Sequence, residues 1–319
     1  MPWWLMQRTE MKRRRLGKRI NVLLKDMIRQ QYAKHKTHGL RHDQSRSILS
    51  LSLQDTDTLS RELVDETCDQ IKMFLLAGHD TTSITLGWIF HWLSRTPRTA
   101  IAVRSELDNL LGHEADPEVV RARLMSSDGP DLVRRMSYIS AVVKETLRLH
   151  PPAATARYTK HGTGFTVRTP AGEKHCLDGM ITHNCEGLIQ RDPAIYGDSA
   201  HYFKPERWLN DDNSNIPASA WRPFERGPRS CIGQEFAMIE IRVVIAVIVR
   251  RFDFVKVGLG ELAFDAKNRP ILGEGGIYAA KSLLYSVSRE SLGCKLGHFE
   301  SEPHTDDGPY RRDRLMPDQ

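Results

Sequence analysis

The stretch FERGPRSCIG, Phe224–Gly233, runs directly into the apolar segment QEFAMIEIRVVIAVIVRRF, residues 234–252. Its spacing, Phe-x-x-Gly-x-Arg-x-Cys-x-Gly, predicts a loop that presents Cys231 just before a helix over residues 234–251. The amide N–H groups at a helix N-terminus favour an anion, and Arg226 and Arg229 add positive charge beside the sulfur. We therefore expect this loop to hold a thiolate.

The glycines and the aromatic residue of the loop fit the same purpose. Gly227 and Gly233 leave room for a flat group to approach the backbone, and Phe224 is placed to cover the sulfur. A thiolate that ligates haem iron needs this combination, whereas a lone cysteine is more often a buried structural residue. The spacing resembles the haem-binding loop of the cytochrome P450 family, the haem-thiolate monooxygenases. This resemblance implies haem b bound to Cys231, with Phe224, Gly227, Arg229 and Gly233 around the cofactor.

Composition is that of a globular protein: 319 residues, 40% hydrophobic and 27% charged. Five cysteines form no Cys-x-x-Cys pair, which argues for a reducing compartment and against a disulfide framework or a structural zinc site. The net charge of +6 is concentrated in a basic cluster over residues 8–19. Such a cluster forms a solvated helix face, a membrane-surface contact or a nucleic-acid contact. No nucleic-acid-binding motif follows it, so no nucleic-acid partner is expected.

Membrane spans are not predicted, because no segment approaches the ~20 apolar residues that a bilayer requires. The opening MPWWLM is too short for a signal-peptide core, and the basic cluster follows it. Full-length proteins of the family that the chain resembles are expected at the cytosolic face of the endoplasmic reticulum membrane. This chain is expected to be cytosolic or peripheral.

Helical periodicity dominates the first hundred residues. A basic helix is predicted over residues 9–36, with an apolar side over residues 20–28, followed by a break over residues 38–60 that holds a short apolar turn. Ser60 has the character of an N-cap for a helix over residues 61–95. At ~1.5 Å per residue this helix would be about 50 Å long and would cross the core of its domain.

The hexad Ala77–Thr82, AGHDTT, lies in the middle of this long helix and is a poor helix interior. The Thr81 hydroxyl can bond back to the Ala77 carbonyl, which predicts either a simple kink or a local opening beside a ligand. The hexad also resembles the oxygen-activation motif of the same family. By that resemblance Thr81 organises water at dioxygen, Asp80 supplies protons, and Ala77 and Gly78 border the substrate pocket.

Further helices are predicted over residues 97–112, 117–126 and 131–149, the last ended by Pro151 and Pro152. Glu145 and Arg148 are three apart and share a helix face, which by itself means only an ordinary ion pair. The segment FKPERW, residues 203–208, resembles the Pro-Glu-Arg segment of the family. The resemblance implies a buried triad of Glu145, Arg148 and Arg207 that holds the cysteine loop.

A strand-rich composition over residues 153–192 predicts a small sheet beside the helices. By resemblance, Arg157 and Arg229 pair with the haem propionates. The residues that would line the substrate pocket are small and suggest room for a bulky, flat substrate: Ala153, Ala154, Thr155 and Ala156.

Three short strands are predicted after the helix over residues 234–251, at 252–257, 277–280 and 283–287, and the polar segment 297–319 is predicted to be disordered. The fold class is therefore mainly α with a small β region, α+β. The order of the motifs implies the C-terminal portion of the cytochrome P450 fold over residues 1–296. The central helix comes so early in the chain that the N-terminal part of the fold is expected to be missing.

The expected function is insertion of one oxygen atom from dioxygen into a small apolar organic substrate. The wording of the motifs resembles fungal enzymes of secondary metabolism. Electrons are expected from an NADPH-dependent flavoprotein reductase docking where four arginines lie, Arg222, Arg226, Arg229 and Arg242. Four alternatives stay open: a truncated, non-catalytic remnant that binds haem weakly or not at all, a basic binding protein, a peroxide-driven reaction and an isomerising reaction.

Overall fold

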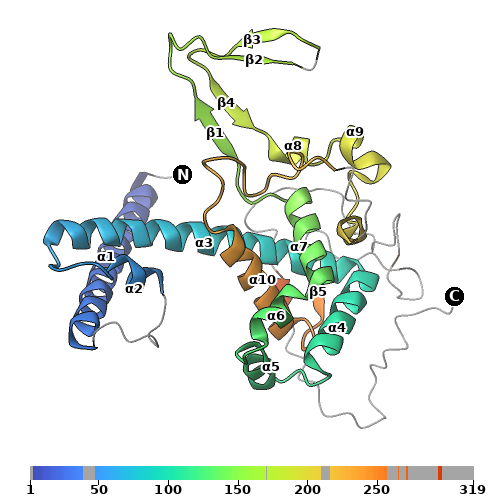
Figure 1. The fold of residues 1–319 in the computed structure, drawn as a ribbon, viewed down its shortest axis with the longest axis horizontal. Helices are drawn as coiled ribbons and strands as arrows, with labels where there is room; N and C mark the ends of the chain where they lie inside the picture. The colour runs from blue at the N-terminus through green and yellow to red at the C-terminus, as the bar shows by residue number, and fades with distance from the viewer. Residues whose placement is uncertain are drawn as a thin grey trace. The chain divides into compact units, whose positions relative to one another are not determined.

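The computed structural model describes residues 3–38, 47–169, 171–209, 216–256, 265, 271 and 294–296. It is mainly helical with small sheets, as the sequence predicts (Figure 1). The chain divides into two compact units, Met1–Asp80 and Thr81–Gln319. The boundary falls inside the helix α3 (Arg61–Arg95), so it separates two groups of packed residues along one continuous helix. The domain over residues 1–296 stays a prediction.

The first unit consists of α1 (Trp3–His38), α2 (Ile48–Ser52) and the first part of α3. Ser60 Oγ accepts a hydrogen bond from the Leu63 amide at 3.1 Å, which confirms the predicted N-cap. A small apolar core joins the helices through five buried side chains, Leu24, Ile28, Leu53, Val64 and Cys68. The predicted helix over residues 9–36 is confirmed and begins earlier, at Trp3.

The predicted apolar side of α1 is only partly correct. Leu24 and Ile28, one turn apart, are buried, whereas four neighbours are exposed, Ile20, Val22, Leu23 and Met27. A helix that meets its partners along one line buries only the side chains on that line. The apolar side predicted over residues 20–28 was therefore wider than the actual contact.

The length predicted for α3 is confirmed, since the helix spans 35 residues from Arg61 to Arg95. The backbone stays α-helical through Ala77–Thr82, so the expected local opening is absent from α3. Each weak helix former costs only up to about 1 kcal/mol relative to alanine, which the flanking turns of a long helix outweigh.

The second unit is built on five further helices of six or more residues: α4 (Pro97–Leu111), α5 (Pro117–Leu124), α6 (Gly129–Arg134), α7 (Ser137–Leu149) and α10 (Gln234–Ile248). The predicted stop at Gly112 is confirmed, with φ of 81° at that residue. α7 packs against α4 and α10, and the last turns of α3 join the same core through Ile89, Trp92 and Leu93 (Figure 1). Phe224, at the start of the cysteine loop, packs against this core, and α10, after the loop, contributes to it. Both ends of the loop are thus connected to one apolar core.

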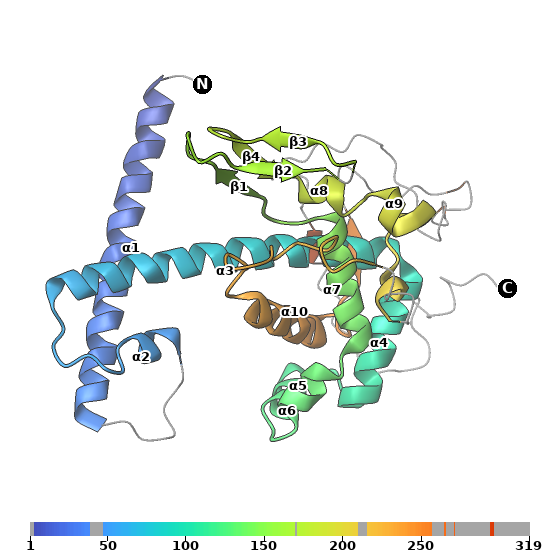
Figure 2. The ribbon, with the colours of Figure 1, turned by 45° about the horizontal axis from the view of Figure 1, so that its top comes forward.

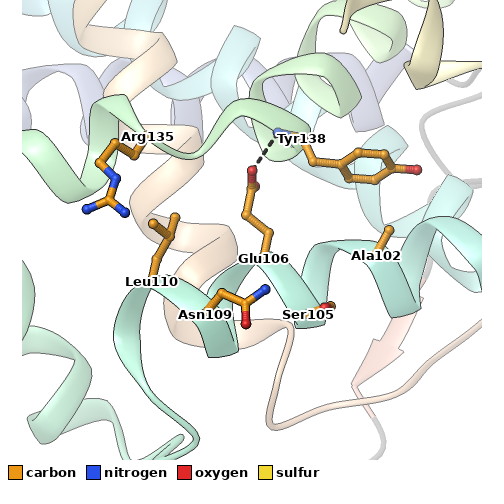
Figure 3. A pocket seen from close by; sticks show the side chains of 7 residues that line it. All are labelled: Ala102, Ser105, Glu106, Asn109, Leu110, Arg135 and Tyr138. Atoms are coloured by element: carbon orange, nitrogen blue, oxygen red, sulfur yellow. Dashed lines mark hydrogen bonds between the residues drawn. The ribbon is translucent and has the colours of Figure 1, made fainter.

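The prediction of one continuous helix over residues 131–149 is wrong, because the helix is interrupted between α6 and α7. The carboxylate of Glu106, on α4, accepts the amide N–H group of Tyr138 at 2.7 Å (Figure 3). It also accepts the Ile139 amide at 2.9 Å and the Ser137 hydroxyl at 3.1 Å. It thereby caps the N-terminus of α7 from a distant helix. No residue next to the break predicts this cap.

Four strands form two antiparallel pairs: β1 (Thr155–Tyr158) with β4 (Ile181–Asn184), and β2 (Thr166–Arg168) with β3 (Lys174–Cys176). Strands β2 and β3 lie between β1 and β4 in the chain, and the outer pair is called the β1–β4 hairpin below. Figures 1 and 2 show both pairs extending away from the helices of the second unit. This small β region confirms the strand-like composition predicted there.

Short helical turns complete the second unit. They are α8 (Glu186–Ile189), α9 (Pro193–Tyr196), η1 (Gly197–Ser199) and η2 (Pro205–Trp208). Strand β5 (Phe254–Lys256) agrees with the prediction at 252–257 and pairs with β6 (Cys294–Leu296). The strands predicted at 277–280 and 283–287 and the segment 297–319 lie outside the described residues. In the part of the chain that the structure describes, no helix has the length and apolar character to cross a membrane.

Candidate functional site

Cys231 lies three residues before α10, at the end of the loop that begins with Phe224. Its side chain is exposed, and its amide donates a hydrogen bond to the Phe224 carbonyl at 2.8 Å, which closes the loop on itself. Gly233 is the N-cap of α10 and offers no side chain to the amides of the first turn. The sulfur is therefore presented to solvent beside the positive end of a helix.

The two glycines of the loop differ in how much the structure depends on them. Gly227 has φ of 82°, a backbone that a side chain strains, while nothing lies within 4 Å of a Cβ built there. A Cβ at Gly233 would meet the Cys231 Sγ at 3.9 Å. Gly227 is thus needed by the backbone, whereas a side chain at Gly233 would make only an ordinary van der Waals contact with the sulfur. The Phe224 ring packs edge-on against Trp221 and the main core.

Glu145, Arg148 and Arg207 come together in a buried cluster. The Glu145 carboxylate takes a bidentate pair of hydrogen bonds from Arg148, at 2.9 and 2.8 Å, and a third from Arg207 Nε at 3.0 Å. Glu145 and Arg148 have no exposed surface and Arg207 has 9%. Two planar guanidiniums on one carboxylate form a rigid junction between α7 and η2.

Two further donors complete the shell of Glu145. The Lys204 amide and the Trp208 indole N–H each donate to the carboxylate at 2.9 Å. Arg148 also donates to three carbonyls, those of Gln190, Ala200 and Tyr202. The sequence indicated the triad through the Pro-Glu-Arg segment, but it did not predict the indole or the carbonyl ligands.

Gln190 is a connecting residue that the sequence did not reveal. Its amide group is fully buried and donates to the Leu147 and Arg148 carbonyls at 3.2 Å, at the C-terminal end of α7. Its Oε1 accepts the Arg222 amide at 2.8 Å, two residues before the cysteine loop begins. The indole N–H of Trp221 donates to the Lys144 carbonyl at 3.1 Å, which holds the segment before the cysteine loop against α7. The start of the loop is thus fixed to the triad helix.

Glu225 is a second residue that the sequence did not single out. Its carboxylate accepts hydrogen bonds from Thr155 Oγ1, from Asn184 Nδ2 at 2.7 Å and from Arg222 Nη2 at 2.7 Å. Burial alone would raise the pKa of Glu225, but these hydrogen bonds outweigh it and lower the pKa to about 2. The available signal was an acidic residue three positions after Arg222, inside a basic loop.

The predicted oxygen-activation residues lie on α3. Asp80 and Thr81 are half-buried, whereas Ala77 and Gly78 are exposed. The Asp80 carboxylate lies 3.2 Å from His79 Nδ1, and the Thr81 carbonyl accepts the Thr85 hydroxyl at 2.8 Å. The Asp80 carboxylate thus reaches solvent, with 47% of the side chain exposed.

The predicted cofactor and pocket residues of the hairpin are exposed apart from Thr155. Arg157 lies on β1 and donates to the Ala156 carbonyl at 2.9 Å, and Arg229 is exposed on the cysteine loop. Ala153, Ala154 and Ala156 are also exposed. The bond from Thr155 to Glu225 brings the start of β1 against the cysteine loop.

The four arginines expected to attract a reductase differ in exposure. Arg222 is tied to Glu225, and Arg242 donates to the Met238 and Val133 carbonyls at 2.8 and 3.0 Å. Arg226 and Arg229 are exposed, although Arg226 also contacts the Ala218 carbonyl. The positive charge that reaches solvent near Cys231 therefore comes from two of the four.

A shallow pocket of about 530 Å³ lies elsewhere in the second unit (Figure 3). Its lining consists of residues from α4 and from the junction of α6 and α7, namely Ala102, Ser105, Glu106, Asn109, Leu110, Arg135 and Tyr138. None of them is a predicted site residue. Glu106 in this lining caps α7, so its presence in the pocket has a structural reason.

Comparison with known proteins identifies the family. The sequence model of the family described as Cytochrome P450 matches residues 1–261. The cytochrome P450 monooxygenase polC of Polytolypa hystricis is 37% identical over 191 residues, which are 58% of this chain and 32% of that protein. The bifunctional cytochrome P450/NADPH–P450 reductase ascE of Acremonium egyptiacum is 35% identical over 220 residues, 66% of this chain and 19% of that protein.

A third relative, the cytochrome P450 monooxygenase acrF of Aspergillus aculeatus, is 35% identical over 211 residues, 58% of this chain and 40% of that protein. The chain therefore spans less than half the length of these curated relatives. The cysteine loop and the buried triad lie within the residues that the family model matches. Since that match extends over most of the chain, the protein belongs to the cytochrome P450 family.

Proposed function

We propose that this chain binds haem b through the Cys231 thiolate and carries the oxygen-activating residues of a monooxygenase. The observation that carries the proposal is the exposed sulfur at the N-terminus of α10, on a loop whose base is held by the buried Glu145 cluster. Because the chain spans only part of its relatives, the complete reaction is part of the proposal.

The residues around Cys231 suit a porphyrin. Ile232, the residue after Cys231, and Phe236, in the first turn of α10, expose 93% and 69% of their surface, which is suited to a flat apolar ring. Arg229 and Arg157 are exposed cations for the two propionates. Among the described residues no group of three or more His, Cys, Asp or Glu side chains is placed to hold a metal ion, so a metal at Cys231 needs ligands of its own, as haem iron has.

The chain's own residues have separate roles in this proposal. Cys231 would hold the haem iron through its thiolate. When bound, the haem iron supplies dioxygen reduction and the transfer of one oxygen atom into a C–H bond. The Thr81 hydroxyl holds water, and Asp80, whose side chain is 47% exposed, passes protons from solvent to it. Ala77, Gly78 and the segment 153–156 border the substrate.

A flavoprotein reductase that uses NADPH is the proposed electron donor. Some relatives carry such a reductase in their own chain, as the name of ascE states. Arg226 and Arg229 are the proposed docking cations, because both are exposed beside Cys231. The proposed substrate is a small apolar organic molecule of fungal secondary metabolism.

The test is the spectrum of the reduced carbon monoxide complex after haem reconstitution. We expect the red-shifted Soret band of thiolate ligation, abolished in Cys231→Ala. Cys185→Ala is the matched control, since Cys185 is also a free, exposed cysteine. Loss of the band in the Cys185 variant, or its survival in Cys231→Ala, would contradict ligation by Cys231.

A second candidate function is a haem-free scaffold. It is favoured by apolar side chains exposed on α3, including Met73 and Leu76, at 63% and 59%. A monomer rarely leaves such a row uncovered. A protein that stays haem-free at saturating haem, with an unchanged circular dichroism spectrum, would select this candidate.

A further inference from the structure

The carboxylate of Glu225 joins the cysteine loop to the β1–β4 hairpin. Thr155 and Asn184 are directly opposite each other at the end of the hairpin, and both donate to Glu225 Oε1. The other oxygen, Oε2, accepts Arg222 Nε at 3.2 Å and Nη2 at 2.7 Å. One side chain of the loop thus binds both strands of the hairpin.

The backbone of Glu225 is unusual for its residue type. With φ of 55°, it is the one residue other than glycine with a left-handed backbone among the residues that the structure describes. Glycine takes this conformation without strain, whereas a glutamate does not. If the side chain had no role, glycine at this position would make the loop more stable.

The position of Glu225 links it directly to the sulfur. It follows Phe224, whose carbonyl accepts the Cys231 amide at 2.8 Å. On the other side, Thr155 lies two residues before Arg157 on β1. Any displacement of Glu225 therefore moves the turn that carries the sulfur relative to the strand that carries Arg157.

We propose that Glu225 is a positioning residue: its carboxylate fixes the Cys231 loop against the β1–β4 hairpin, so that the sulfur and Arg157 are held in one frame. This inference rests on the proposed function only for its consequence on haem. The tether itself is a property of the chain without a ligand. The Glu225 side chain is 8% exposed and hydrogen-bonded at both oxygens, which makes it a rigid link.

The experiment compares Glu225→Gly with Glu225→Gln in the full chain. The glycine variant relieves the backbone and removes every hydrogen bond of the side chain. The glutamine variant keeps the shape and one acceptor. In hydrogen–deuterium exchange of the haem-free protein, we expect the amides of residues 226–231 to exchange about tenfold faster in Glu225→Gly, which corresponds to one lost charge-assisted hydrogen bond. Glu225→Gln should fall between it and the unmodified protein.

Two further variants distinguish the effect of losing the tether from the effect of losing a negative charge near the sulfur. Asn184→Ala removes a hairpin donor, and its effect on loop exchange should disappear in the Glu225→Gly background. Glu235→Gln removes the same charge four residues beyond Cys231, at an exposed position of α10, and should leave loop exchange unchanged.

Haem reconstitution adds a spectroscopic readout. If Cys231 binds haem, Glu225→Gly should lose most of the thiolate-type carbon monoxide band while retaining its fold by circular dichroism. A missing band in the unmodified protein would overturn haem ligation and leave exchange to decide the tether. Loop exchange that is unchanged or slower in Glu225→Gly would overturn the tether. If Glu225→Gly does not fold, the same comparison between Glu225→Gln and Asn184→Ala decides it.

Discussion

Replacing Glu145 by alanine removes the carboxylate that pairs with two buried guanidiniums. Arg148 and Arg207 would keep their bonds to backbone carbonyls, including that of Ser199 at 2.8 Å, but would lose the carboxylate that neutralises both charges. The Trp208 indole and the Lys204 amide would each lose an acceptor. The cost therefore has two parts, an uncompensated charge and unpaired donors.

The magnitude follows from the burial. Breaking a buried ion pair from one side costs about 3–5 kcal/mol. Since about 1.4 kcal/mol changes an equilibrium tenfold, the unfolded population of the second unit should rise by roughly two to four orders of magnitude. That is a large part of the ~5–15 kcal/mol that stabilises an ordinary domain. We expect Glu145→Ala to be recovered mostly without haem, and Glu145→Gln to lose nearly as much stability because the charge is absent in both.

The measurement is chemical denaturation followed by tryptophan fluorescence, since Trp208 and Trp221 lie beside the cluster. The matched control is Glu118→Ala, because Glu118 and Arg121 form the same Glu-x-x-Arg pattern on α5. That pair is 75% and 68% exposed, so its loss should cost at most about 1 kcal/mol. A loss below ~1 kcal/mol in Glu145→Ala, or equal losses in both variants, would refute the reasoning. Normal haem loading of Glu145→Ala would separately refute the role of the cluster in holding the loop.

Three other changes test the structure around this cluster. Glu106→Ala removes the cap of α7 and should cost about 1–2 kcal/mol in the same assay, whereas an unchanged midpoint would contradict the cap. Gln190→Ala leaves the Leu147 carbonyl and the Arg222 amide without their buried partner, so we expect a loss of about 1–3 kcal/mol, and full stability would contradict this connection. Burial lowers the pKa of His150 to about 3, so the unfolded chain, with a histidine pKa near ~6.5, takes up the proton first. The stability that this residue contributes is complete above about pH 6.5 and is lost as the pH falls toward 3, by about 1.4 kcal/mol per pH unit. His150→Phe keeps the stacking on Trp88, at 3.6 Å between ring centroids, and should reduce this slope between pH 6.5 and 4.5; equal slopes would contradict the burial of a neutral imidazole.

Much of the secondary structure followed from periodicity and from helix ends. The 35-residue α3 begins after the Ser60 cap, and α4 runs from Pro97 to the residue before Gly112, as predicted. These boundaries depend on residues within one or two turns of the helix end. The break before α7 could not be predicted, because its cap, Glu106, comes from about thirty residues earlier in the chain.

Local sequence also could not show which residues of one type are exposed and which are engaged in hydrogen bonds within the fold. Arg222 and Arg242 were grouped with Arg226 and Arg229 as surface charge, yet the first two are engaged in hydrogen bonds inside the second unit. Likewise, Glu225 was one acidic residue in a basic loop until the hairpin placed Thr155 and Asn184 on it. Contacts between strands and loops bring together residues that are distant in the chain, and no local pattern records them.

The sequence by itself determined the family, the cysteine that precedes α10 and the helical character of the chain. It could do so because a ten-residue spacing around Cys231 and the apolar period of each helix are local properties. Tertiary structure decided how the two Glu-x-x-Arg pairs differ physically, since the Pro-Glu-Arg segment indicated the Glu145 triad only by resemblance. Glu118–Arg121 and Glu145–Arg148 read alike, but only the second is enclosed by η2, Gln190 and Trp208. Burial removes the water that screens an ion pair, and burial is a property of the packed fold.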